Sequence, residues 1–184
     1  VRCCTQNGIR GGSATVHFPI WHKEIRDILV LKNNKGTEDN RVRKLDYSIQ
    51  LSALFYQRFI DNKDITLFSP HDVPSLYENF GTDSFDSLYT QYESDASIPR
   101  TTINAQELIL DLLKERAETG RIYIMNIDHC NTHSSFKDKV SMSNLCQEIT
   151  LPTTPLQHID DPNGEIALCI LSAINVGTLR SLSG

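Results

Sequence analysis

The segment from Asn104 to Gly120 carries the start, body and stop signals of a helix. Asn104 is followed three residues later by Glu107, an N-terminal capping pattern, and Gly120 suits the left-handed residue that often ends a helix. The apolar residues between them recur on one face: Ala105, Leu108, Ile109, Leu112 and Leu113. We predict a helix over Ala105–Thr119 and a strand over Arg121–Ile127 after it.

Helical and strand-like patterns alternate along the rest of the chain. The predicted strands are Ala14–Ile20, Ile65–Phe68, Leu145–Leu151 and Ile166–Ile174. The predicted helices are Trp21–Leu31, Leu45–Ile60 and two short ones between Pro74 and Tyr92. Polar loops are expected at Lys32–Lys44 and Pro152–Gly164. Short strands that alternate with helices favour an α/β architecture.

The first stretch, Cys3–Ser13, contains three glycines and Arg10. Glycines allow the backbone to approach a ligand closely, so we expect a flexible loop there. The spacing is not that of a Walker phosphate loop.

The charge and hydropathy of the chain exclude several function classes. The net charge of −5 leaves no basic patch of the kind that nucleic-acid backbones require, although free nucleotides stay possible ligands. No apolar run approaches the roughly 20 residues that span a bilayer, and no leader precedes Cys3. We therefore expect a cytoplasmic protein without membrane or nucleic-acid partners.

Because the chain starts at Val1 and ends at Gly184 after an apolar run, we expect it to be an internal piece of a longer protein.

The five cysteines form an odd set without paired C-x-x-C spacing. In a cytoplasmic protein each is expected to be a thiol, either buried and inert or reactive. In an extended strand Asn144, Cys146 and Glu148 would share a face, which places an amide, a thiol and a carboxylate together. These groups could orient a hydroxyl, give up a hydrogen atom and take a proton. The alternative is a strand with a polar outer face that carries a cysteine by chance.

Other candidate positions have simpler explanations. Cys169 lies in an apolar run where an inert core cysteine is the ordinary assignment. The segment His129–His133 has no second group of zinc ligands at a usual spacing along the chain, so structural hydrogen bonding is favoured over metal binding. A disulfide between the adjacent Cys3 and Cys4 would be strained. No metal site is predicted.

Nearly the whole chain resembles the large subunit of class I ribonucleotide reductase, most closely the versions of T-even-type bacteriophages. The segments that carry the resemblance are, in order, Thr5–Gly12, Val30–Asn34, Leu67–Pro74, Glu115–Tyr123, Asn144–Ile149 and Gly164–Cys169. The resemblance implies that residues 1–184 supply the central portion of a ten-stranded α/β barrel, with Cys146 at the tip of a finger loop inside it.

The resemblance also implies roles for individual residues. Cys146 would become a thiyl radical that removes the 3′ hydrogen of a ribonucleoside diphosphate, Glu148 would take the 3′-hydroxyl proton, and Asn144 would bind substrate hydroxyls. Cys169 would be half of the dithiol that reduces the 2′ position. The mobile loop between the substrate and the specificity site would comprise Gln6, Arg10, Gly11, Gly12 and Ser13.

The expected partners follow from the same resemblance. They are a second large subunit, a small subunit whose diiron-tyrosyl type centre generates the radical, dNTP or ATP effectors, and thioredoxin or glutaredoxin as reductant. The second redox cysteine and the radical-transfer tyrosines fall outside this chain in the family's order, so the 184-residue piece is expected to be inactive alone. Two alternatives remain: a non-catalytic split or relict nucleotide-binding fragment, and an enzyme that uses adenosylcobalamin.

Overall fold

The computed structural model describes residues 5–178 of the chain. The chain divides into two compact units, Val1–Pro152 and Thr153–Gly184. The first unit contains every helix and strand except the short 3-10 helix η3 (Val176–Thr178). Cys3 and Cys4 lie outside the described residues.

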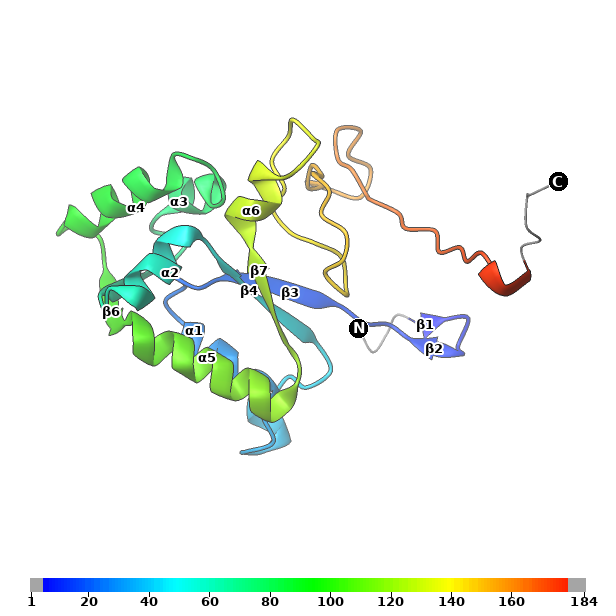
Figure 1. The fold of residues 1–184 in the computed structure, drawn as a ribbon, viewed down its shortest axis with the longest axis horizontal. Helices are drawn as coiled ribbons and strands as arrows, with labels where there is room; N and C mark the ends of the chain where they lie inside the picture. The colour runs from blue at the N-terminus through cyan, green and yellow to red at the C-terminus, as the bar shows by residue number, and fades with distance from the viewer. Residues whose placement is uncertain (1–4, 179–184) are drawn as a thin grey trace. The chain divides into compact units, whose positions relative to one another are not determined.

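A three-stranded parallel sheet organises the first unit (Figure 1). Its strands are β3 (Thr15–Pro19), β4 (Asp46–Leu51) and β7 (Ile122–Asn126), in the order β3-β4-β7. In the register of the sheet, Phe18 lies opposite Ile49, which lies opposite Ile124. The central strand β4 therefore pairs with partners that precede and follow it in the chain.

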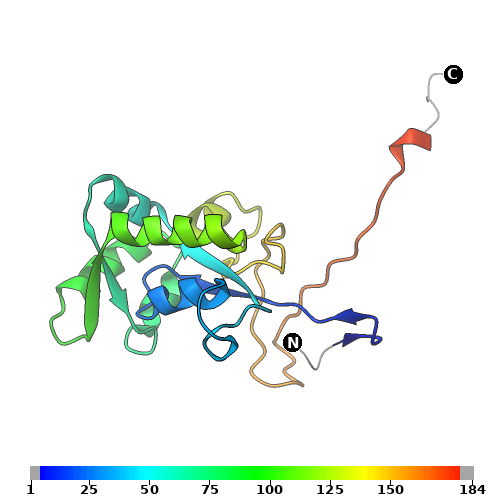
Figure 2. The ribbon, with the colours of Figure 1, turned by 90° about the horizontal axis from the view of Figure 1, so that it is seen from below.

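Helices connect these parallel strands. The first crossover contains α1 (Ile25–Leu29), η1 (Val30–Lys32) and η2 (Glu38–Asn40), and the second contains α2 (Ala53–Ile60) and α5 (Ala105–Thr119). Both crossovers run in the same direction across the sheet, so the preferred right-handed connection places their helices on one face. In agreement, α1 contacts α5 and α5 contacts α2 and β7; Figure 2 shows α5 as the long green helix.

The second crossover also contains an antiparallel pair with two short helices. Strand β5 (Asp64–Phe68) pairs with β6 (Arg100–Asn104), and between them lie α3 (Pro74–Asn79) and α4 (Phe85–Ser94). Aromatic side chains join this part to α2: the ring of Phe55 lies 5.4 Å from that of Tyr89 and 6.0 Å from that of Phe85. Phe55 is completely buried, so this cluster is the centre of the hydrophobic core beside the sheet.

The two faces of the sheet differ in chemistry. On β4 the side chains of Tyr47, Ile49 and Leu51 belong to the hydrophobic core, and in a strand they share one face. The alternate residues Asp46, Ser48 and Gln50 point to the other face. In the register, His17 and Tyr123 flank Ser48, and Pro19 and Met125 flank Gln50. One face thus packs on helices, and the other is a polar face.

The prediction of one helix over Leu45–Ile60 was wrong for its first half, which forms β4. The residues from Asp46 to Leu51 alternate polar and apolar, a pattern with period two that competes with the helical spacing in the same stretch. The sheet decides between them, because β4 is paired on both sides and almost fully buried. Helix formation starts only at Ala53, within α2.

Most other predicted elements of the first unit are confirmed. The helix over Ala105–Thr119 has the predicted ends: the Asn104 Oδ1 accepts hydrogen bonds from the backbone N–H groups of Gln106 and Glu107, and Gly120 has φ +64°. The predicted helix over Trp21–Leu31 is shorter, with α1 and η1 at its end. Strand β6 and helix α6 (Ile127–Thr132) were not predicted.

The N-terminal stretch is more regular than the predicted flexible loop. Strand β1 (Thr5–Gln6) pairs antiparallel with β2 (Arg10–Gly11). The turn between them has positive φ at Asn7 and Gly8, a conformation that both residue types tolerate. The stretch is therefore a small hairpin.

The second unit contains no strand among its described residues. The predicted strand over Ile166–Ile174 is absent there, and its apolar side chains are exposed, Ile170 by 93%. A strand needs a hydrogen-bonded neighbour, and no described strand pairs with this run.

The three parallel strands of the first unit do not close into a barrel within residues 5–178. None of the helices in that range is both long and apolar enough for a transmembrane span.

Candidate functional site

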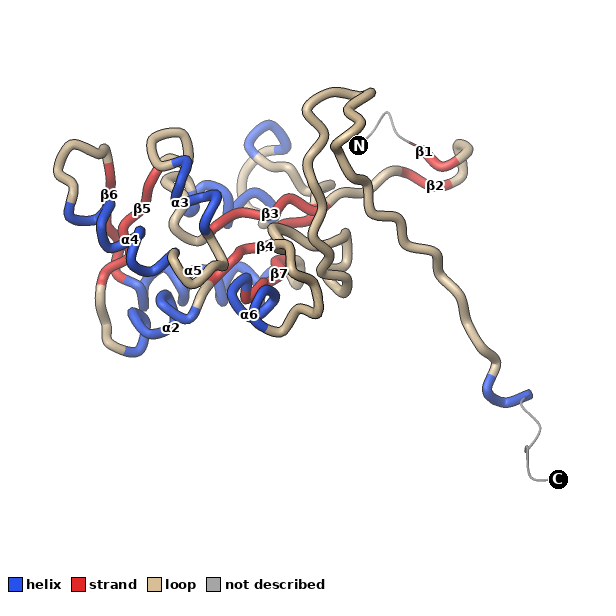
Figure 3. Tube along the Cα trace, turned by 90° about the horizontal axis from the view of Figure 1, so that it is seen from above, coloured by secondary structure: helices blue, strands red, loops and turns tan. Residues whose placement is uncertain are grey.

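The polar face of the sheet is covered by the segment that leads to Cys146. The carbonyl oxygens of Ser141, Ser143 and Leu145 accept hydrogen bonds from side chains of the sheet. The donors are Gln50 Nε2 at 2.7 Å, His17 Nε2 at 3.2 Å and Thr15 Oγ1 at 2.7 Å, respectively. Every second carbonyl therefore faces the sheet, as in an extended segment. This segment is the stretch after α6 that lies beside β3 and β4 in Figure 3.

A turn follows immediately and contains Cys146. The backbone N–H of Asn144 donates to the carbonyl of Ile149 at 3.4 Å, and the Asn144 Oδ1 accepts from the backbone N–H of Ile149 at 2.9 Å. The backbone N–H of Gln147 donates to the carbonyl of Asn144 at 3.2 Å, and Gln147 has φ +66°. The predicted strand over Leu145–Leu151 was therefore wrong, and the expectation that alternate residues share a face does not apply.

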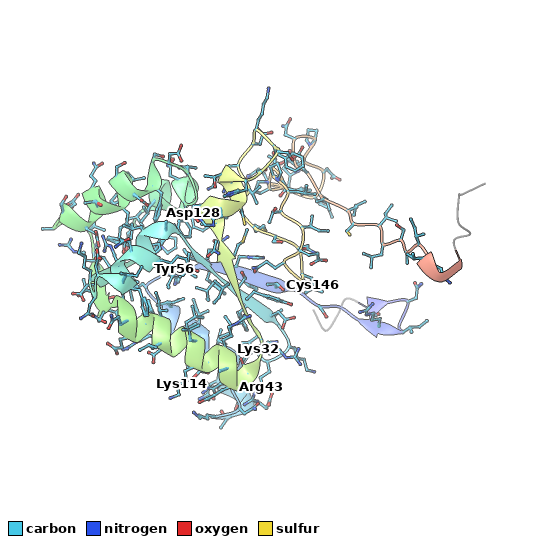
Figure 4. All side chains as sticks on the ribbon, viewed as in Figure 1. Lys32, Arg43, Tyr56, Lys114, Asp128 and Cys146 are labelled. Atoms are coloured by element: carbon cyan, nitrogen blue, oxygen red, sulfur yellow. The ribbon has the colours of Figure 1, made fainter. Side chains whose placement is uncertain are left out.

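The predicted chemical groups nevertheless lie on this one short turn. The side chains of Cys146 and Glu148 are exposed, and no hydrogen bond or ion pair holds either of them within residues 5–178. The Oδ1 of Asn144 is used to close the turn, whereas its Nδ2 has no acceptor in the described part of the chain. Figure 4 labels Cys146 where this segment reaches the sheet. A thiol, a carboxylate and an amide donor are thus all available to a ligand.

Cys169 and Cys146 belong to different compact units of the chain. Cys169 is exposed and belongs to the second unit, whereas Cys146 belongs to the first. Of the predicted mobile loop, Gln6 and Arg10 pair across the hairpin, and Gly11 ends its second strand. Gly12 and Ser13 then lead into β3, with Ser13 and Arg10 exposed. The loop residues are therefore adjacent in the chain to Thr15, which holds the Cys146 turn.

Two polar residues of α6, Asp128 and Asn131, make hydrogen bonds to other segments of the first unit. The Asp128 carboxylate accepts a hydrogen bond from the backbone N–H of Ala53 at 2.7 Å, at the first residue of α2. The Asn131 side chain donates to the carbonyl of Val140 and accepts from its N–H, at 3.0 and 2.8 Å. These contacts fix the loop before the Cys146 segment. Within residues 5–178 no three His, Cys, Asp or Glu side chains are grouped as metal ligands.

The sequence analysis did not identify the residues that hold the turn on the sheet. They are Thr15, His17, Ser48, Gln50 and Gln147. For the four residues on β3 and β4 the signal was their place as polar members of alternating strands, because a polar residue in a buried parallel strand needs a hydrogen-bond partner. The identity of the partner segment was not visible in the local pattern.

His17 is held as a neutral imidazole. The Ser143 carbonyl can only accept, so Nε2 carries the proton, and Nδ1 is buried without a partner among the described residues. Burial lowers the pKa of His17, and the hydrogen bond to Ser143 raises it by less. His17 therefore presents a neutral ring on the polar face at physiological pH.

We expect this histidine to make the sheet less stable in mild acid. Because the folded-state pKa lies below the unfolded value of about 6.5, the unfolded chain binds the extra proton first as the pH falls. The contribution of neutral His17 to the free energy of unfolding is complete above about pH 6.5 and is lost as the pH falls toward the folded-state pKa. An NMR titration of the His17 ring should give a midpoint below about 6.5, with His17→Phe used to assign the signal. A midpoint above that value would contradict the burial argument.

Comparison with known proteins identifies the family of the chain. Residues 1–182 match the family described as ribonucleotide reductase, barrel domain. The chain is 58% identical to the ribonucleoside-diphosphate reductase subunit alpha of Haemophilus influenzae over 99% of its own length and 25% of that protein. It is 54% identical to the ribonucleoside-diphosphate reductase 1 subunit alpha of Escherichia coli K12, covering 85% of the chain and 21% of that protein.

A phage protein is also among the relatives. The chain is 46% identical to the ribonucleoside-diphosphate reductase subunit alpha of Enterobacteria phage T4, over 94% of the chain and 23% of that protein. The chain spans about a quarter of the length of these relatives. The match along nearly all of its residues shows that the chain belongs to the ribonucleotide reductase family and forms part of the barrel domain.

Proposed function

We propose that the subunit containing this chain reduces ribonucleoside diphosphates to deoxyribonucleoside diphosphates through a thiyl radical on Cys146. The observation that carries the proposal is the turn that presents the exposed Cys146 thiol beside Glu148 and the free Nδ2 of Asn144. The names of the relatives support the reaction class.

Each group has a step suited to its chemistry. The Cys146 sulfur radical takes the hydrogen atom from C3′ of the ribose, and the Glu148 carboxylate takes the proton of the 3′-hydroxyl. The Asn144 amide donates a hydrogen bond to a substrate hydroxyl. The 2′-hydroxyl then takes one hydrogen of a dithiol as a proton and leaves as water, and the dithiol supplies the second hydrogen to C2′ and two electrons as it becomes a disulfide. Cys169 is one thiol of that pair, and Cys146 regains its radical when it returns the hydrogen atom.

The remaining components come from outside these residues. A small subunit with a diiron-tyrosyl type centre generates the radical, and thioredoxin or glutaredoxin reduces the disulfide. Within this chain, the segment from Gln6 to Ser13 relays which dNTP or ATP effector is bound within a dimer of large subunits. We place the assembly in the cytoplasm, which is that of the host if the subunit is phage-encoded.

The test is deoxynucleotide formation by purified proteins. The full-length subunit, mixed with its small subunit, a ribonucleoside diphosphate, an effector and a dithiol, should form deoxynucleotide. The 184-residue chain in the same mixture should form none, because the second redox thiol is supplied from elsewhere in the subunit. Failure of the full-length subunit would refute the proposed reaction, and turnover by the short chain would refute the need for the missing groups. A requirement for adenosylcobalamin would show that this cofactor, and not a small subunit, generates the radical.

A further inference from the structure

Hydrogen bonds hold the turn on the sheet both before and after Cys146 in the chain. A backbone carbonyl makes the contact before Cys146, and a side chain makes the contacts after it. Before the thiol, the carbonyl of Leu145 is fixed by the hydroxyl of Thr15 at 2.7 Å. After the thiol, the described hydrogen bonds from residues 147–152 to the sheet all come from the side chain of Gln147. Its Oε1 accepts from Ser48 Oγ at 2.5 Å, and its Nε2 donates to the carbonyl of Ile124 at 2.8 Å.

Gln147 therefore connects two strands at once. Ser48 lies on the central strand β4, and Ile124 lies on β7. An amide is suited to this place because it offers an acceptor to a hydroxyl and a donor to a carbonyl. Neither Leu nor Glu can do both at neutral pH, so the side chain is chemically matched to its two partners.

The backbone conformation of Gln147 also favours a structural role for its two side-chain hydrogen bonds. A left-handed φ of +66° costs a residue with a Cβ about 1 kcal/mol. Glycine would relieve that cost but would lose both side-chain hydrogen bonds. The same conformation directs the side chain of Gln147 to the sheet, while the side chain of Cys146 remains exposed.

We propose that Gln147 is a positioning residue for Cys146, whose amide fixes the turn on Ser48 and Ile124 so that the thiol is held in one place. This inference rests on the proposed function, because it assigns Gln147 an effect on the reaction of Cys146. A displacement of about 1 Å at a reacting group lowers a rate by up to about a hundredfold. Loss of the amide is therefore expected to act on the chemical step rather than on nucleotide binding.

The experiment uses the full-length subunit with its small subunit and compares Gln147→Leu with Gln91→Leu, the same change at an exposed residue of α4. Gln147→Leu should lower kcat by about tenfold and leave KM within about twofold, whereas Gln91→Leu should change neither. Ser48→Ala should lower kcat by less, and combining it with Gln147→Leu should add little, because both remove the same contact. An unchanged kcat in Gln147→Leu would overturn the proposal.

A second variant gives a readout that a general loss of packing would not produce. In Gln147→Glu the carboxylate still accepts from Ser48 but repels the Ile124 carbonyl, and protonation restores a donor. The ratio of its kcat to that of the unaltered enzyme should rise as the pH is lowered from about 7 toward the ordinary glutamate pKa of about 4.3. A flat ratio would count against the contact with Ile124.

Failure of this inference is distinguishable from failure of the proposed function. If Cys146→Ser is inactive and Gln147→Leu is fully active, only the positioning role is wrong. If Cys146→Ser retains turnover, the proposed function is wrong, and Gln147 is judged without activity, by amide hydrogen exchange of residues 145–149. Exchange there should become about fivefold faster in Gln147→Leu, as expected when about 1 kcal/mol of local contact is lost. Unchanged exchange would overturn the anchoring role as well.

Discussion

Cys146→Ser is expected to lower deoxynucleotide formation by the full-length subunit by at least about a thousandfold. A hydroxyl has the shape of a thiol but holds its hydrogen atom more strongly, so the step that removes the 3′ hydrogen is lost. Binding of the nucleotide should change little, because the substitution alters one atom of the turn. Radiolabelled product formation and equilibrium dialysis with a ribonucleoside diphosphate would measure the two quantities separately.

Cys130→Ser is the matched control for this substitution. Cys130 is partly buried on α6, and burial raises the pKa of its thiol, which is the behaviour of an unreactive cysteine. The control should retain nearly all turnover. Equal losses in the two variants would show that any cysteine replacement damages the subunit, and retained turnover in Cys146→Ser would refute the radical role.

Phe55→Ala should destabilise the first unit by about 3–5 kcal/mol. Phe55 is fully buried, and its ring contacts Phe80, Phe85 and Tyr89, so the substitution leaves a cavity where α2 meets the helices after β5. Hydrogen exchange of the β4 and β7 amides measures this change even within a larger subunit, because those amides exchange only when the sheet opens.

Phe136→Ala makes the same chemical change at an exposed site. The Phe136 side chain is 49% exposed, so its loss should cost about 1 kcal/mol or less. If the two substitutions had similar effects on exchange, the aromatic cluster around Phe55 would not be the centre of the core.

Local sequence signals predicted the elements whose causes are local. The ends of α5 depend on Asn104 and Gly120 themselves, and these residues act on the backbone beside them. The split between β4 and α2 was missed because two periodicities overlap, and only pairing with β3 and β7 favours one of them. Strand β6 was missed because it pairs with β5 across an intervening pair of helices.

The candidate residues of the site remain a prediction from the sequence, whereas the strand geometry predicted for them was wrong. The residue types and spacing of Asn144, Cys146 and Glu148 indicated the chemistry, and the resemblance indicated the reaction. Their conformation depends on hydrogen bonds to distant strands, such as the one between Thr15 and Leu145, which are 130 positions apart. A local pattern contains no information about such partners, so an alternating strand was the natural but incorrect prediction.

The pairing of β4 with both β3 and β7 has a consequence for the order in which the site is assembled. Strands β3 and β4 are close in sequence, whereas β7 follows only after α2, α3, α4 and α5. Closing the longer loop costs more chain entropy, so the contact between β4 and β7 forms late in folding. The Ile124 carbonyl that Gln147 binds is in place only after that contact exists. Because Cys146 follows β7 in the chain, we expect its turn to be fixed during synthesis only when the sheet beneath it is complete.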